Sequence, residues 1–137
     1  MELLYTVNAP EGYCGIVPGR NVLFSSGVGN WKPEYVEALC ANLLELAKKF
    51  NGKNFAYIAD PSRMNPILSK EVSAGFVAIH GAIEKIGCKA VAFLDGNTAA
   101  MKLQSQKHQN VSEAKGMQVL HFKTEDQALE WLEKIGI

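Results

Sequence analysis

Six polar residues follow two strongly apolar segments of this 137-residue sequence and could form one binding surface. The segments are "NFAYIAD" and "CKAVAFLD", and both are apolar on two faces, as the central strands of a parallel sheet are. Ligands of open α/β sheets bind outside the carboxyl ends of such strands. The pattern therefore predicts a ligand- or partner-binding rim formed by Asp60, Ser62, Arg63, Asp95, Asn97 and Thr98. Alternatively, Asp95-Gly96-Asn97 simply makes a turn and caps the following helix.

Ser69 is a candidate for a different chemistry, covalent modification, because it stands just before an apolar helical stripe that begins at Val72. A serine in that position also accepts a hydrogen bond from an early backbone N–H, which stabilises a helix by about 1 kcal/mol. The Glu71 carboxylate, in the first turn, interacts favourably with the helix dipole and would repel a phosphate on Ser69. The local sequence therefore favours a helix cap over a modified switch.

The spacings that catalytic and metal sites require do not occur in the sequence. There is no G-x-S-x-G nucleophile motif and no H-x-x-x-H spacing among the three histidines, which are His80, His108 and His121. Gly27 and Gly29 lack the rest of a phosphate-binding glycine motif and indicate a strand-to-helix turn. We expect no catalytic residue, no metal and no cofactor.

Charge and cysteine usage restrict the partners and the compartment. Lys plus Arg equal Asp plus Glu at 14 each, which argues against nucleic acid or an anionic membrane as the main partner. No apolar run is long enough for an integral membrane segment. The three cysteines lack a C-x-x-C pair and are typical of buried thiols in a reducing compartment: Cys14, Cys40 and Cys88. These features predict a cytoplasmic protein.

The elements that must position these residues alternate along a single domain spanning 1–137. Apolar periodicity predicts strands near 3–8, 21–29, 54–60, 88–95 and 117–122, and helices over 33–50, 69–86, 97–106 and 124–137. The segment "APEGYCGIVPGR" is interpreted as a turn. The expected fold is α/β, with about five mainly parallel strands, helices packed on the sheet, and the order β-β-α-β-α-β-α-β-α.

Three features of this order resemble the STAS fold of anti-sigma-factor antagonists, and especially the SpoIIAA-like group of STAS/SEC14-type proteins. "FAYIADPS" resembles the family's third strand with its Asp-x-Ser turn, and the stretch from Asp60 to Ser69 has the length of the family's loop. "VLHFKTEDQALEWL" resembles the final strand and helix of the SpoIIAA-like group. The resemblance covers nearly the whole chain as a pattern of elements. It implies a small regulatory domain that binds a protein partner.

The same resemblance bears on Ser69. In partner-switching antagonists this helix begins with Asp-Ser-Ser-Gly, and a partner kinase phosphorylates the second serine. The matching residues here are Leu68, Ser69, Lys70 and Glu71. Lys70 cannot accept a phosphate, so the phospho-serine motif is not intact, although a one-residue slip in loop register would place Ser69 at the modified position.

Three functions remain in competition. The first is a non-enzymatic regulatory or protein-interaction domain, in which the surface around Ser62, Arg63 and Ser69 contacts a protein. The second is a SEC14-like carrier of a lipid or small apolar molecule. The apolar loop residues Met64, Ile67 and Leu68 would line the mouth of its pocket, or alternatively would plug the core beneath the loop. The third is a small enzyme of unknown reaction.

We also expect a homodimer. The early segment "NVLFSSGV" is apolar and is expected near a sheet edge, where bare backbone groups favour pairing, and "GYCGIV" adds apolar residues close by. Formal neutrality leaves no long-range repulsion between two copies. The early strands or the second helix would form the contact.

Overall fold

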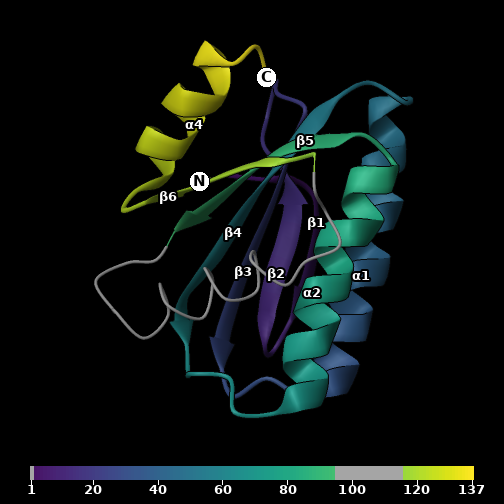
Figure 1. Ribbon diagram of the computed structural model, residues 1–137, viewed down its shortest axis with the longest axis vertical. Helices are drawn as coiled ribbons and strands as arrows, with labels where there is room; N and C mark the ends of the chain where they lie inside the picture. Colours follow the sequence, from purple (N-terminus) through teal and green to yellow (C-terminus); the bar gives the residue numbers. More distant parts are fainter. Residues whose placement is uncertain (1, 95–115) are drawn as a thin grey trace.

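A computed structural model describes residues 2–94 and 116–137 of the chain. The described residues form one six-stranded sheet with its strands in chain order (Figure 1). The strands are β1 (Leu4–Ala9), β2 (Gly12–Ile16), β3 (Val22–Gly29), β4 (Phe55–Met64), β5 (Cys88–Leu94) and β6 (Gln118–Phe122). The helices are α1 (Pro33–Ala47), followed by the 3-10 turn η1 (Lys48–Phe50), α2 (Lys70–Lys85) and α4 (Glu125–Lys134). The predicted α/β class is confirmed.

The sheet has six strands and not about five, because β2 lies in the segment that the sequence analysis interpreted as a turn. A Cβ at Gly12 would lie 2.1 Å from the Ser26 carbonyl oxygen, so glycine is required where the two backbones meet. The glycines that suggested a turn therefore permit close strand pairing. The pairings β1–β2 and β2–β3 are antiparallel, whereas β3–β4, β4–β5 and β5–β6 are parallel, which makes the sheet mixed.

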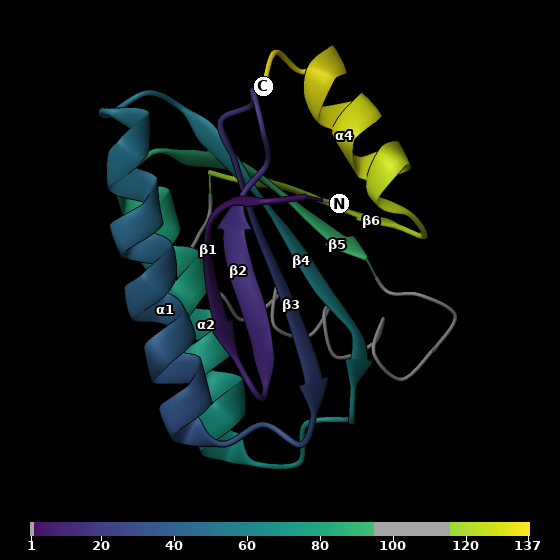
Figure 2. The ribbon, with the colours of Figure 1, turned by 180° about the vertical axis from the view of Figure 1, so that it is seen from behind.

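Helices cover both faces of the sheet. Helices α1 and α2 lie side by side on one face, where Leu43, Val72 and Ile83 pack on the central strands (Figures 1 and 2). Helix α4 lies on the other face, where Ala128 and Leu132 pack over small and branched strand residues. Each central strand is therefore buried on both sides, which explains its continuous apolar sequence.

Local sequence signals set the helix ends. Helix α1 with η1 spans the predicted 33–50, and Asn51 then adopts a left-handed conformation at φ 54°. Ser69 is the N-cap of α2, and its Oγ accepts a hydrogen bond from the Val72 N–H at 3.3 Å. Thr124 caps α4 in the same way through the Gln127 N–H at 3.2 Å. The predicted cap role of Ser69 is confirmed.

The structure corrects one strand boundary and one strand position. Strand β4 does not end at Asp60 but continues to Met64, and it pairs with β3 as far as Gly29 with a shift in register between Ser26 and Val28. Strand β3, the apolar segment expected near an edge, is a central strand between β2 and β4. The helix predicted over 97–106 and the predicted site residues Asp95, Asn97 and Thr98 lie outside the described residues.

Candidate functional site

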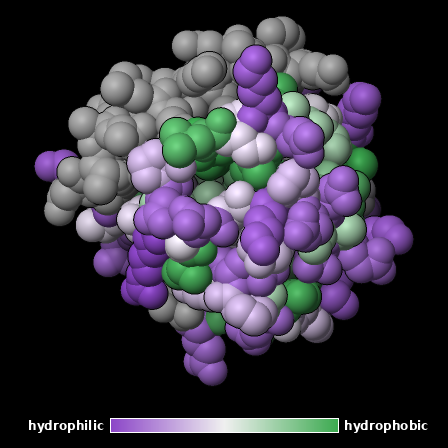
Figure 3. All heavy atoms as spheres, turned by 90° about the horizontal axis from the view of Figure 1, so that it is seen from below, coloured by the Kyte–Doolittle hydropathy of each residue, from purple (hydrophilic) through white to green (hydrophobic). Residues whose placement is uncertain are grey.

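A pocket of about 50 Å³ opens on the face covered by α1 and α2, at the carboxyl ends of β3 and β4. Figure 3 looks onto this end of the molecule and shows apolar surface inside a ring of hydrophilic residues. The position is the one that open parallel sheets use for ligands. The pocket is lined by Ser25, Ser26, Gly27, Trp31, Leu39, Tyr57, Ala59, Asp60, Pro61, Met64, Ile67, Phe76, Ile79, His80 and Phe93.

A pair of hydroxyl groups lies inside this largely apolar pocket. Ser25 Oγ on β3 and Tyr57 Oη on β4 are 2.5 Å apart, and both side chains are buried. Burial raises the pKa of Tyr57 above its ordinary value, although the hydrogen bond with Ser25 acts in the opposite direction. The phenol is therefore neutral at physiological pH. One hydroxyl donates to the other, and the second proton of the pair can be donated to a ligand.

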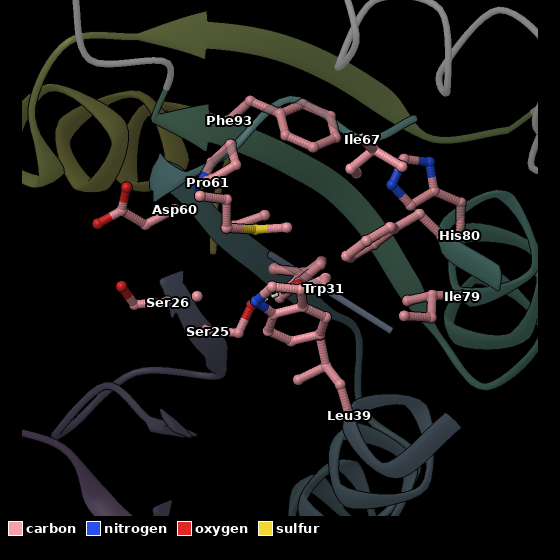
Figure 4. A pocket seen from close by; sticks show the side chains of 15 residues that line it. Ser25, Ser26, Trp31, Leu39, Asp60, Pro61, Ile67, Ile79, His80 and Phe93 are labelled. Atoms are coloured by element: carbon pink, nitrogen blue, oxygen red, sulfur yellow. Dashed lines mark hydrogen bonds between the residues drawn. The ribbon is translucent and has the colours of Figure 1, made fainter. Parts of the chain in front are cut away.

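Aromatic side chains from three different segments form the walls. The Trp31 ring, from the loop between β3 and α1, lies 5.6 Å from the Phe76 ring of α2. The His80 ring of α2 lies 5.6 Å from the Phe93 ring of β5, and His80 is only 3% exposed. Figure 4 shows the Trp31, His80 and Phe93 rings around the same space, with Leu39 and Ile79 at its α-helical side. The pocket thus suits a flat, mostly apolar group.

The loop that connects β4 to α2 covers the pocket. Met64 is buried beneath it and Ile67 is half-buried, and both line the pocket. Asn65 fixes the loop to the neighbouring strand connection, because its Nδ2 donates to Asn30 Oδ1 at 2.8 Å and its N–H donates to the Gly29 carbonyl at 2.9 Å. Leu68, the next apolar residue of the loop, is 94% exposed. Of the three apolar loop residues named from the sequence, Met64 and Ile67 thus line the pocket and Leu68 does not.

A bulge in β4 lies at the pocket rim and contains the predicted residues Asp60 and Ser62. Ser26 pairs with Asp60 and Val28 with Arg63, so Pro61 and Ser62 stand opposite the single residue Gly27. Proline is tolerated in such a bulge because it has no N–H to donate. Asp60 Oδ1 accepts hydrogen bonds from the Ser62 N–H at 3.0 Å and the Ser62 hydroxyl at 2.5 Å. The carboxylate is therefore used in a local turn.

The structure brings only part of the predicted rim to the pocket. Asp60 lines its edge, but Figure 4 shows its carboxylate and the Ser26 hydroxyl directed away from the aromatic rings. Arg63 is exposed, and Ser69 is engaged at the start of α2. Ser62 bonds Asp60 and is not part of the lining.

The most central pocket residues were missed from the sequence. Ser25 and Tyr57 stand in apolar strands as ordinary strand residues, and the hydroxyls meet only because β3 and β4 pair in parallel with Leu23 beside Tyr57. Trp31 was likewise not among the predicted site residues. A usable signal was present, because a serine pair and a tyrosine inside otherwise apolar strands demand buried hydrogen-bond partners.

The described residues contain neither a metal-binding cluster nor a membrane-spanning helix. Within 2–94 and 116–137, no group of three or more His, Cys, Asp and Glu side chains is placed to hold a metal ion. No helix in this described part combines the length and the apolar character needed to cross a bilayer.

Comparison with known protein families matches no family model to this chain, and a search of curated proteins gives no match.

Proposed function

We propose that this protein is a non-enzymatic regulatory domain that binds a small organic molecule in the pocket beside Ser25 and Tyr57. The observation that carries the proposal is the buried hydroxyl pair, which supplies directed hydrogen bonding inside aromatic and aliphatic walls. A few convergent polar groups in an apolar concavity are the usual composition of a ligand site. The site also lies where parallel strands end.

The protonated states of the buried Tyr57, Cys14 and Cys88 side chains favour ligand binding over catalysis as the function of this site. The Tyr57 phenol is kept neutral by burial, so it donates a hydrogen bond and does not act as a base. Burial also raises the pKa of the Cys14 thiol to about 11 and that of Cys88 to about 12, which disfavours the nucleophilic thiolate at neutral pH. The small volume favours a compact ligand over a lipid, since typical pockets for drug-sized ligands are roughly 300–1,000 Å³.

We assign the STAS/SpoIIAA-like type as part of the same proposal. The strand–helix alternation from β3 to β5, the Asp60–Ser62 turn and the helix that begins after Ser69 support this assignment. The exposed Arg63 near the end of β4 and the exposed Leu68 in the loop that follows are the proposed contact for a protein partner. Ligand occupancy beneath Met64 and Ile67 would change the position of this loop, so binding of the protein partner would depend on whether the ligand is bound.

Two further properties complete the proposal. The protein is cytoplasmic, which is supported by three free cysteines suited to a reducing compartment. It forms a homodimer through β1, whose six residues are all exposed and which, among the described residues, has β2 as its only strand neighbour (Figure 2). Leu4, Tyr5 and Val7 of this strand are large apolar residues with at least 38% exposure. An edge of this kind can pair with the same strand of a second copy.

The ligand proposal is tested by removing both hydroxyl groups together. The double variant Ser25→Ala/Tyr57→Phe leaves neither partner with an unsatisfied polar group, so we expect it to remain folded. We expect native mass spectrometry of gently purified wild-type protein to show a bound small molecule that the double variant lacks. Ser62→Ala is the matched control, because this hydroxyl is at the rim but is not part of the pocket lining, and the variant should keep the ligand.

Two results would contradict the proposal. One is a wild-type protein that neither retains a small molecule nor gains thermal stability from any member of a library of small organic compounds. The other is a double variant that is folded and retains the ligand as the wild type does.

A further inference from the structure

Trp31 separates the ligand pocket from a second pocket on the same face of the sheet. The second pocket has a volume of about 70 Å³, and its lining shares Ser26, Trp31 and Leu39 with that of the first. Its other walls come from β1, the β1–β2 turn, β2 and α1, including Glu11 of the turn and Tyr35 and Asn42 of α1. The indole therefore stands as a partition between two spaces.

Neither space alone holds a six-membered ring. A cavity of about 150 Å³ is the size known to bind benzene, whereas these pockets measure about 50 and about 70 Å³. Together they approach that size, provided that Trp31 moves aside. The indole belongs to a loop and not to a helix or strand, and Gly27 beneath it carries no Cβ. A Cβ there would lie 2.8 Å from Trp31 Cζ2.

The indole N–H is itself an incomplete hydrogen-bonding group. Trp31 Nε1 is buried and has no hydrogen-bond partner among the described residues. A buried donor without an acceptor destabilises the folded protein, and an acceptor atom of a bound ligand would remove this cost. A second donor is available a short way along the same wall, from the Ser25–Tyr57 pair.

Charge restricts the ligand further. The linings of the two pockets contain no Lys or Arg within the described residues, while Asp60 lines the first and Glu11 the second. An anionic ligand would be desolvated beside carboxylates with no cation to balance it. The aromatic walls and the available donors instead match a flat ring that carries an acceptor.

We propose that the two pockets form one site for a neutral, single-ring molecule with a hydrogen-bond acceptor. Such a molecule is an aromatic nitrogen heterocycle or a cyclic carbonyl compound. Trp31 turns to admit it and donates its N–H to the acceptor. The inference rests on the proposed function and specifies its ligand class. It assigns Trp31 two roles, as the movable wall and as the group that selects the acceptor.

The test uses pyridine and benzene, which have the same shape and differ in one acceptor atom. In a Trp131→Phe variant, Trp31 is the only tryptophan, so the tryptophan fluorescence of this variant reports on this site alone. Trp131 packs against Phe122 on the other face of the sheet, away from the two pockets. At neutral pH we expect saturable titration by pyridine, with a shift in Trp31 emission and affinity about tenfold higher than for benzene. Benzoate and tetramethylammonium should bind more weakly than pyridine.

A second variant isolates the N–H group. Trp31→Phe retains an aromatic ring but no donor, and ligand-observed NMR should show that it no longer prefers pyridine over benzene. Equal binding of pyridine and benzene to the Trp131→Phe protein would overturn the acceptor role while leaving the pocket as a ligand site. Tighter binding of benzoate or tetramethylammonium would overturn the neutral class. Failure of every probe to bind, in a protein that retains a native ligand, would reject this inference and leave the proposed function standing.

Discussion

Single polar atoms decide how this site is interpreted. The carboxylate of Asp60 was one of the predicted site residues, yet among the described residues its hydrogen bonds come from Ser62, two residues away. The hydroxyls of Ser25 and Tyr57, which belong to different strands, instead lie in the pocket. Ser62 engages one carboxylate oxygen of Asp60, Oδ1, in a local turn, whereas the Ser25–Tyr57 pair has a proton to donate into the pocket.

Ser69 gives the residue-scale prediction. Ser69→Ala removes the acceptor of the Val72 N–H, so we expect the free energy of unfolding to fall by about 1 kcal/mol. Urea denaturation measures this change. Lys70→Ala, at an exposed first-turn residue, is the control and should have a much smaller effect. If Ser69→Ala were silent while Ser69→Asp selectively lost a protein partner, the modified-switch interpretation would replace the cap.

At the scale of elements, the packing of α1 on α2 sets the helical side of the pocket. Leu39 of α1 and Phe76, Ile79 and His80 of α2 all line it. The two helices approach closely at Gly75, where a Cβ would lie 2.6 Å from Val36 Cγ1. A larger residue there would separate the helices and alter the pocket.

Gly75→Ala tests this contact. Alanine favours an exposed helix by about 1 kcal/mol over glycine, yet we expect a net loss of about 1–3 kcal/mol because the methyl group collides with Val36. Combining Gly75→Ala with Val36→Ala should destabilise the protein by less than the sum of the two single changes, as thermal or urea unfolding would show. An increase in stability from Gly75→Ala alone would contradict the close contact.

For the whole molecule, the position of each strand within the sheet determines which surface can pair. The residues first expected at an edge, Val22, Leu23 and Phe24, are buried in the centre. The edge is β1, and its pairing with β2 is irregular between Leu4 and Val7 but regular from Val7 to Ala9. Self-association through β1 is therefore expected to centre on Val7–Ala9.

Val7→Lys tests the dimer proposal. A charge on the exposed edge opposes strand pairing, so we expect at least a tenfold weaker association than in the wild type, measured by sedimentation equilibrium at micromolar concentration. Leu120→Lys, on the opposite edge strand β6, is the matched control and should leave association unchanged. A wild-type protein that sediments only as a 15.0 kDa species across a wide concentration range would rule out the dimer.

The sequence by itself determined the features that depend on short-range physical chemistry. Apolar periodicity predicted α1 and α2 within a few residues, the two-sided apolar runs predicted β4 and β5, and the spacing of Ser69 from Val72 predicted the cap. These features depend on neighbours within about one helical turn, and such neighbours are visible in the chain order.

Only the tertiary structure decided the strand count and the composition of the pocket. Strand β2 resembled a turn because its glycines are required by close neighbours on both sides. Gly12 meets the β3 backbone at Ser26 and Gly15 meets Leu3 and Leu4, and no local pattern encodes these contacts. The meeting of Ser25 with Tyr57 depends on the parallel register of β3 and β4, and Trp31 reaches Phe76 only because α1 and α2 pack on the same face. Side chains distant in sequence form one site when strand pairing and helix packing bring them together, and a single sequence does not state that pairing.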